Sequence, residues 1–259
     1  MITSLESANL KIARAEEHFD SIKRSIRDYS LSVPYEIVKL QDGTELLTIK
    51  RHPPDEISIL AGEIVYQIRS ALDHLAFELV TVNPSGVKLP TDWEEHCLFP
   101  LWLTPPKRGT AYNCFRRVLP GISETAFALI ESWQPYHRQG AANVHRLIAQ
   151  LSNVDKHRHL NVVLAKVSQH EYVRQSKGYE MSRAQGGLQH GAQIESLLFI
   201  DPREAAVRER HFFAYVTFDE PTVGDGAATL EVPNVLDVLL QSMRTFVIPE
   251  FEKLLKNPQ

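Results

Sequence analysis

Hydrophobic residues recur every three or four positions from Leu5 to Tyr29, and charged residues fill the positions between them. This spacing is the a/d seam of a helix that packs lengthwise on another helix. Thr3 and Glu6 have the spacing of a capping box at its start. The sequence therefore predicts a long first helix whose seam lies against a second long helix, either in the same chain or in a homodimer.

The pattern changes over residues 34–51, where two short apolar segments flank Asp42 and Gly43. An Asp-Gly pair in that setting favours a β-hairpin. A pair of prolines follows, and after it the apolar positions form an unbroken helical stripe to about Val82. We therefore expect a hairpin and then a second long helix.

The stretch from residue 83 to residue 109 is rich in proline and predicts an ordered but irregular connection. Helical patterns return from Gly121 to Trp133 and from about Ala142 to Val154. These segments predict a third helical layer.

Short apolar segments after residue 159 predict a small antiparallel sheet. The predicted strands cover residues 160–167, 194–200 and 212–218, and the Gly186-Gly187 pair is expected in a polar linker between strands. A last helix begins at Pro233, with a kink or break at Pro249.

Together these elements predict an α+β fold: mainly a helical bundle, with an N-terminal β-hairpin and a small antiparallel sheet before the C-terminal helix. We expect a single domain over residues 1–259. Its helical part extends to about residue 158 and includes the hairpin at 34–51. The sheet and the closing helix occupy about 159–256.

The composition limits which partners and which cellular compartment are expected for the protein. The net charge of −4 gives no general attraction for nucleic acid or for an anionic membrane. Cys97 and Cys114 are too few for a disulfide framework and lack Cys-x-x-Cys spacing, so we expect reduced thiols. No apolar segment approaches the roughly 20 residues needed to span a bilayer, and the N-terminus lacks a signal-peptide pattern. A cytoplasmic location without a membrane partner is the expectation.

Two segments place charged residues beside apolar stripes. Arg69 and Asp73 are one turn apart on the second long helix, where they can form a salt bridge, and Asp155 and Arg158 continue the core-facing stripe of a later helix. Since buried charges need partners, we predict one cross-helix cluster in which Arg69 meets Asp155, and Asp73 meets Arg158 or His157. The residues predicted for this binding or structural cluster, beside Arg69, are Asp73, Asn153, Asp155, Lys156, His157 and Arg158, with Lys156 turned outward.

The words RSALDHL and N-x-D-K-H-R, with FPLW and QPY between them, resemble a group of uncharacterised bacterial proteins over about residues 54 to 160. The segment Arg69-Ser-Ala-Leu-Asp-His74 also resembles the Arg-x(4 to 6)-His pattern of the HEPN superfamily, helical proteins that include metal-independent endoribonucleases. That resemblance implies a composite site shared by two protomers, in which Arg69 binds phosphate and His74 acts as acid or base.

The sequence is compatible with three functions. The first is a HEPN-like RNA-binding protein or metal-independent endoribonuclease that uses Arg69 and His74, with RNA as its partner. The second is a non-enzymatic helical interaction protein whose charged cluster only fixes packing, and the third is a small-ligand-binding protein. The sequence has no His-Glu-x-x-His, Gly-x-Gly-x-x-Gly or Walker motif, so neither a metal nor a cofactor is predicted.

Overall fold

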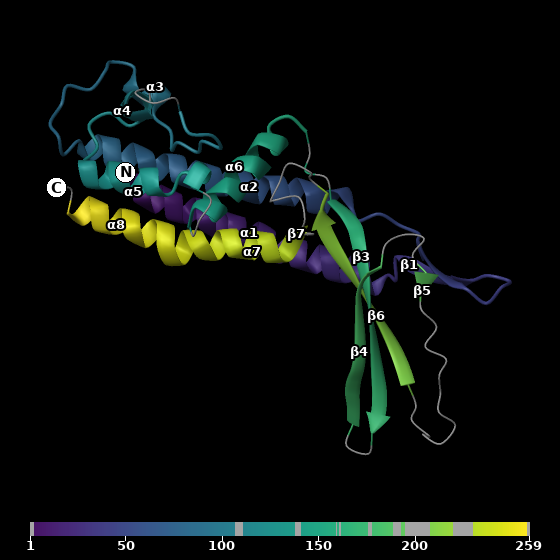
Figure 1. Ribbon diagram of the computed structural model, residues 1–259. Coiled ribbons are helices and arrows are strands. Elements are labelled where there is room, and N and C mark those ends of the chain that lie inside the picture. The colour runs from purple at the N-terminus through teal and green to yellow at the C-terminus, as the bar shows by residue number, and fades with distance from the viewer. Residues whose placement is uncertain are drawn as a thin grey trace.

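The protein is described by a computed structural model that covers residues 3–106, 111–137, 141–158, 160, 162–175, 178–188, 193–194, 208–219 and 230–257. Helices dominate this part of the chain and lie side by side in a bundle, and both termini lie at the end of the bundle away from the sheets (Figure 1). The helical elements are α1 (Ser4–Leu31), α2 (Asp55–Val82), α3 (Trp93–His96), α4 (Ala111–Val118), α5 (Glu124–Ser132), the 3-10 turn η1 (Pro135–His137), α6 (Ala141–Asp155), α7 (Val232–Ser242), the π-helical segment η2 (Met243–Val247) and α8 (Ile248–Lys256).

The first helix packs along the second, as its apolar seam predicts. The capping box is formed, because Thr3 and Glu6 exchange side-chain and backbone hydrogen bonds at the start of α1. Most of the predicted seam is buried, including Phe19, which is 8% exposed, and Leu5 and Ile26 are partly buried. Its partner is α2 of the same chain, so the seam is closed within the chain.

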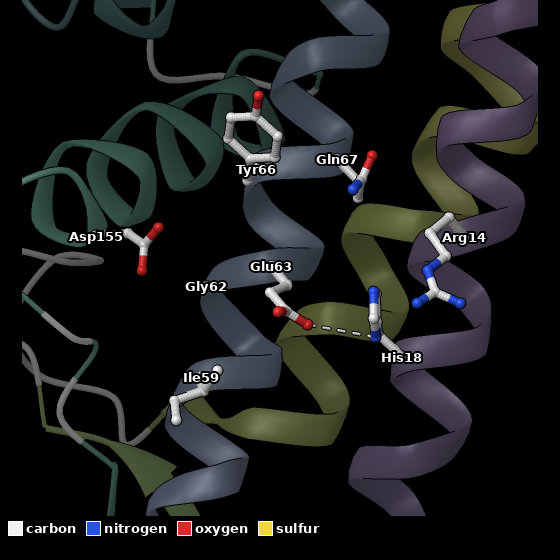
Figure 2. A pocket seen from close by; sticks show the side chains of 8 residues that line it. All are labelled: Arg14, His18, Ile59, Gly62, Glu63, Tyr66, Gln67 and Asp155. Atoms are coloured by element: carbon white, nitrogen blue, oxygen red, sulfur yellow. Dashed lines mark ion pairs between the residues drawn. The ribbon is translucent and has the colours of Figure 1, made fainter.

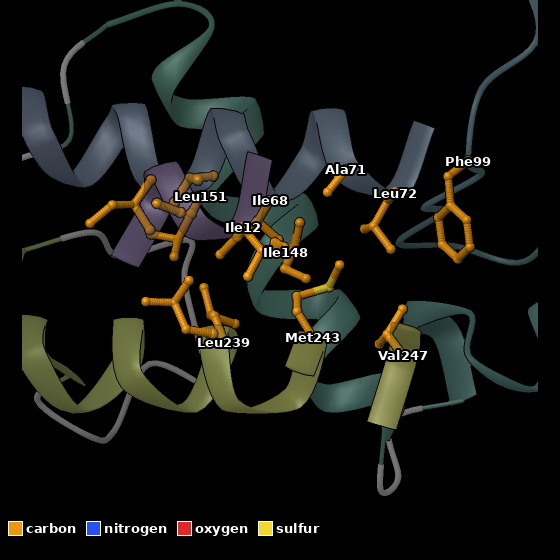
Figure 3. Packing of buried hydrophobic residues seen from close by; sticks show 14 of the residues in the cluster. Ile12, Ile68, Ala71, Leu72, Phe99, Ile148, Leu151, Leu239, Met243 and Val247 are labelled. Atoms are coloured by element: carbon orange, nitrogen blue, oxygen red, sulfur yellow. The ribbon is translucent and has the colours of Figure 1, made fainter. Parts of the chain in front are cut away.

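The core lies where α7, η2 and α8 pack beneath α1, α2 and α6 (Figure 3). Side chains from all these helices interdigitate there and are fully or almost fully buried, which is the main source of stability for such a bundle. Labelled members of this core are Ile12, Ile68, Ala71, Leu72, Phe99, Ile148, Leu151, Leu239, Met243 and Val247.

The closing helix changes its winding just before Pro249. Met243–Val247 forms a π-helical segment, and α8 continues from Ile248 with Pro249 in its first turn. Proline has no backbone N–H and its ring collides with the carbonyl one turn earlier, so the wider π turn accommodates it without ending the helix. The break predicted at this proline is therefore a local change of winding.

The strands form two antiparallel sheets, β1-β2-β5 and β4-β3-β6-β7. The predicted hairpin is β1 with β2, and the larger sheet extends away from one end of the bundle (Figure 1). The strands are β1 (Tyr35–Lys39), β2 (Glu45–Ile49), β3 (Val162–Gln175), β4 (Gly178–Leu188), β5 (Gln193–Ile194), β6 (Arg208–Phe218) and β7 (Leu230–Glu231).

Three details differ from the sequence-based expectation. Gly186 and Gly187 lie in β4 and not in a linker, at an irregularity of the ladder with β3 where the pairing shifts between Val167–Leu188 and Gln169–Gln185, a place that glycine tolerates well. Of the strand predicted at 194–200, only its first residue lies among the described residues, in β5. The helix expected from Gly121 begins instead at Glu124, because the Ser123 side chain caps it, while Gly121 takes a left-handed turn with φ of +78°.

These observations establish an α+β fold that is mainly helical, with an N-terminal hairpin and a small antiparallel sheet before the C-terminal helices. Within the part of the chain that the structure describes, none of the helices combines the length and apolar character required to cross a bilayer.

Candidate functional site: a polar cleft beside Gly62

Arg69 and Asp73 hold the backbone of a neighbouring loop. The Arg69 Nη2 atom donates a 2.6 Å hydrogen bond to the carbonyl oxygen of Phe99, and Asp73 Oδ1 accepts one of 2.8 Å from the Phe99 N–H. The two side chains also form the predicted salt bridge along α2, with Nη2 and Oδ1 3.2 Å apart. The pair thus satisfies both backbone groups of a fully buried residue, which is a structural role.

The same loop is held from its other side by Gln134, which is fully buried. Its Nε2 donates to the carbonyl oxygens of Pro100 and Ile130, and its Oε1 accepts from the Trp102 N–H. The segments RSALDHL, FPLW and QPY therefore meet in one hydrogen-bonded unit. Anchoring of the loop accounts for the presence of Arg69, Asp73 and Gln134 in these segments.

His74 is partly buried on α2. It lies five positions after Arg69, so at about 100° per residue the two side chains leave the helix roughly 140° apart. The structure does not bring the two onto one face of α2. Their roles in the HEPN resemblance stay a prediction.

The ion pairs predicted between the two helices do not form among the described residues. Arg69 pairs with Asp73 on its own helix, and neither Arg69 with Asp155 nor Asp73 with Arg158 or His157 forms an ion pair in the described part of the chain. The reason is the crossing point of the helices: the end of α6 meets α2 at Gly62, which is about 10 Å along the helix axis from Arg69 at 1.5 Å per residue.

The N-x-D-K-H-R segment closes α6, and most of it faces solvent. Asn153, Lys156, His157 and Arg158 are exposed, so Lys156 is turned outward as predicted, whereas Asp155 is partly buried. Basic side chains at this end of a helix are favourable, because the macrodipole gives the C-terminal end a partial negative charge. A cleft of about 310 Å³ borders the exposed side of this segment, and Leu103 and Gln150 also line it.

Asp155 lies directly against the backbone of α2. A Cβ atom at Gly62 would be only 2.2 Å from Asp155 Oδ1 and 2.9 Å from its Cγ, far below any real contact distance. Glycine is disfavoured inside a helix by roughly 1 kcal/mol relative to alanine. Glycine at position 62 therefore weakens the helix slightly, but its lack of a side chain leaves room for the Asp155 carboxylate.

Around this contact an open cleft of about 570 Å³ lies over α2, between α1 and α6 (Figure 2). Most of its side chains are polar, and they come from three helices. The residues that line it are Arg14 and His18 of α1, Ile59, Gly62, Glu63, Tyr66 and Gln67 of α2, and Asp155 of α6. We call this site the Gly62 cleft.

The charged groups of the Gly62 cleft are partly paired. His18 Nδ1 lies 3.4 Å from Glu63 Oε2, which joins α1 to α2 (Figure 2). Arg14 Nη1 lies 2.6 Å from Glu17 Oε2, outside the cleft. Gln67 Oε1 is buried and accepts no hydrogen bond from the described residues. The cleft is thus lined by two carboxylates, whereas the unmatched amide oxygen of Gln67 is closed off from solvent.

Of the residues that line the cleft, the sequence pattern singled out Asp155. It did not indicate Arg14, His18, Glu63 or Gln67, because their positions are typical of the solvent-facing sides of helices α1 and α2. One signal was present in the sequence. Gly62 is an isolated glycine inside a long helical pattern, and such a glycine usually has a packing or functional reason.

Metal binding has no structural support in the described residues, where no three His, Cys, Asp or Glu side chains gather as a ligand group. Comparison with known proteins gave no match to a family model, to a curated protein or to a solved structure. The geometry of the Gly62 cleft is therefore the main indication of function.

Proposed function

We propose that this protein is a non-enzymatic, small-ligand-binding protein and that its ligand occupies the Gly62 cleft. The observation that carries the proposal is the contact of Asp155 with Gly62, which sets a carboxylate from one helix into an open polar cleft formed by two others. Ligand sites are typically concave and hold a few convergent polar groups, as this cleft does.

The structural role of Arg69 and Asp73 supports this choice over a ribonuclease. A phosphate-binding arginine needs its guanidinium free to meet the substrate, whereas Arg69 Nη2 is bound to the Phe99 carbonyl and to Asp73. Among the described residues that line the Gly62 cleft there is no serine, threonine or cysteine, so the commonest nucleophiles are missing from it as well.

Thermal unfolding tests the proposal with a panel of small anionic, neutral and cationic molecules. Parent protein is compared with Gly62→Ala, whose methyl group displaces the Asp155 carboxylate, and with Thr81→Ala, an exposed position on the same helix. We expect at least one compound to raise the Tm of the parent and of Thr81→Ala but not of Gly62→Ala, since a ligand stabilises only the state that binds it. If no compound acts, or if all three proteins respond equally, the proposal is wrong.

A further inference from the structure

The strand β1 lies at the free edge of the sheet β1-β2-β5. Among the described residues, β2 pairs with β1 on one side and no strand pairs with it on the other. The hairpin projects from the end of the helical bundle (Figure 1). The sheet is small, because its third strand β5 has only two residues, and an unpaired edge is a ready template for another strand.

The hydrogen bonds of the hairpin define which backbone groups of β1 face outward. The Leu40 N–H donates to the Thr44 carbonyl oxygen at 2.7 Å, and the Lys50 N–H donates to the Pro34 carbonyl oxygen at 2.8 Å. Since bonded residues alternate along an antiparallel ladder, the even-numbered residues of β1 face β2. The backbone groups that point to the free edge are therefore those of the odd-numbered residues.

The side chains of this segment are apolar and exposed. Five large apolar side chains within ten residues are between 36% and 74% exposed, namely Leu31, Val33, Ile37, Val38 and Leu40. Exposed apolar side chains that gather in one place commonly mark a protein interaction site. A strand added to this edge would cover part of them while its backbone pairs with that of β1.

We infer that the added strand is β1 of a second copy of this chain, which pairs antiparallel across a two-fold axis at Val38. Val38 then stands opposite the partner's Val38. Ile37 exchanges two backbone hydrogen bonds with the partner's Lys39, and Lys39 exchanges two with the partner's Ile37. The two sheets become one, and the interface uses none of the residues that line the Gly62 cleft, so it is independent of the proposed function.

The charges around Val38 are compatible with self-pairing. An interface across a two-fold axis brings the same surface of each copy together, so this surface must be complementary to itself. Glu36 forms an ion pair with Lys50 of its own hairpin, and Lys39 stands opposite Glu45 in the β1–β2 register. The charges that flank the apolar centre are thus balanced within each copy.

Cysteine cross-linking tests the inference in a Cys97→Ala, Cys114→Ala protein. Opposite residues of a non-hydrogen-bonded antiparallel pair have Cα atoms about 4.5 Å apart, which a disulfide can bridge. Mild oxidation should therefore link Val38→Cys into a dimer but not Ile37→Cys, which is one residue out of register. Val87→Cys, an exposed position in the connection after α2, is the second control. Gel electrophoresis without reductant separates the products.

Sedimentation of the protein with its own cysteines measures the association itself. We expect the parent to shift from monomer to dimer between about 5 and 500 µM, as a small interface would give. Val38→Lys sets two like charges directly opposite each other and should raise the dissociation constant at least about tenfold, whereas Val87→Lys should leave it unchanged. Thermal unfolding confirms that each variant is folded.

A parent that stays monomeric at the highest concentration would overturn the inference, because the edge would then not bind its own copy. So would a dimer that is unaffected by Val38→Lys, since it would form through another surface. Equal cross-linking of Val38→Cys and Ile37→Cys would contradict the pairing at Val38.

Discussion

The carboxylate of Asp155 occupies the space that a side chain at Gly62 would need, with Oδ1 2.2 Å from the position of a Cβ atom. Two helices that are far apart in the sequence thus fit together through a missing side chain on one and a charged side chain on the other. The relationship makes the two positions energetically dependent on each other.

A double-mutant cycle measures this dependence. Alanine at position 62 should gain about 1 kcal/mol of helix propensity when Asp155 is already alanine, because nothing then opposes the new methyl group. With Asp155 present, the gain should be offset by displacement of the carboxylate. Urea unfolding of the parent, both single variants and the double variant gives the four free energies of unfolding. The same gain in both backgrounds would show that the two residues do not meet.

Loss of the loop anchor should be more damaging. In Asp73→Ala the buried Phe99 N–H loses its acceptor, which should lower the free energy of unfolding by about 2 kcal/mol. Asp73→Asn keeps an acceptor oxygen and should lose less. The exposed Lys156→Ala serves as the control and should change stability by less than about 0.5 kcal/mol. Losses of the same size in Asp73→Ala and Lys156→Ala would contradict the structural role of Asp73.

Cys97 should react slowly with thiol reagents. Burial, with a smaller contribution from the nearby Asp73 carboxylate, raises the pKa of its thiol to about 12. Since the thiolate is the reactive form, alkylation at pH 8 in a Cys114→Ala protein should be at least about tenfold slower than that of a free thiol and should keep increasing above pH 10. Mass spectrometry follows the modification. A rate equal to that of the free thiol would show that the thiol is neither buried nor shifted.

The ion pair between Glu16 and Arg244 should give a pH-dependent contribution to stability. Arg244 donates from Nε and Nη2 to the two carboxylate oxygens at 2.8 and 2.7 Å, and this hydrogen bonding lowers the pKa of Glu16 below its usual 4.5. A lowered carboxylate pKa stabilises the folded state above the unfolded-state pKa, and this stabilisation is lost as the pH falls through the folded-state pKa.

The expected difference between the parent and Glu16→Gln is below about 1 kcal/mol at pH 7, because both side chains are more than a third exposed. It should shrink as the pH is lowered from 5 toward 3. Urea unfolding of both proteins across that range checks the sign. A difference that grows on acidification would contradict the assignment.

The HEPN resemblance leads to a competing prediction. It expects RNA cleavage that survives chelation of divalent metal and disappears in His74→Ala, whereas a binding protein that uses the Gly62 cleft should cleave no RNA. Gel analysis of RNA incubated with parent, His74→Ala and Lys156→Ala separates the two accounts. Chelator-resistant cleavage that is lost only in His74→Ala would favour the ribonuclease.

Local patterns predicted the helices well and the site only in part. The seam around Ile12 and Phe19 follows from helical periodicity, which is a local property. By contrast, the position of Asp155 depends on where α6 crosses α2, and the pairing of β4 depends on a ladder with β3. Periodicity placed Asp155 on the side of α6 that meets α2, but it also put Arg158 on that stripe, whereas α6 ends at Asp155 and Arg158 is exposed. It contains no information on which turn of α2 the stripe would meet.

The central claim is that the Gly62 cleft binds the ligand. The most direct measurement is the change in backbone amide chemical shifts when the parent protein and Gly62→Ala are titrated with a compound that raises the Tm of the parent. We predict that the shifts cluster on Arg14, His18, residues 59–67 and Asp155 in the parent and disappear in Gly62→Ala. Shifts centred on Arg69 to His74, or shifts that persist unchanged in Gly62→Ala, would contradict the claim.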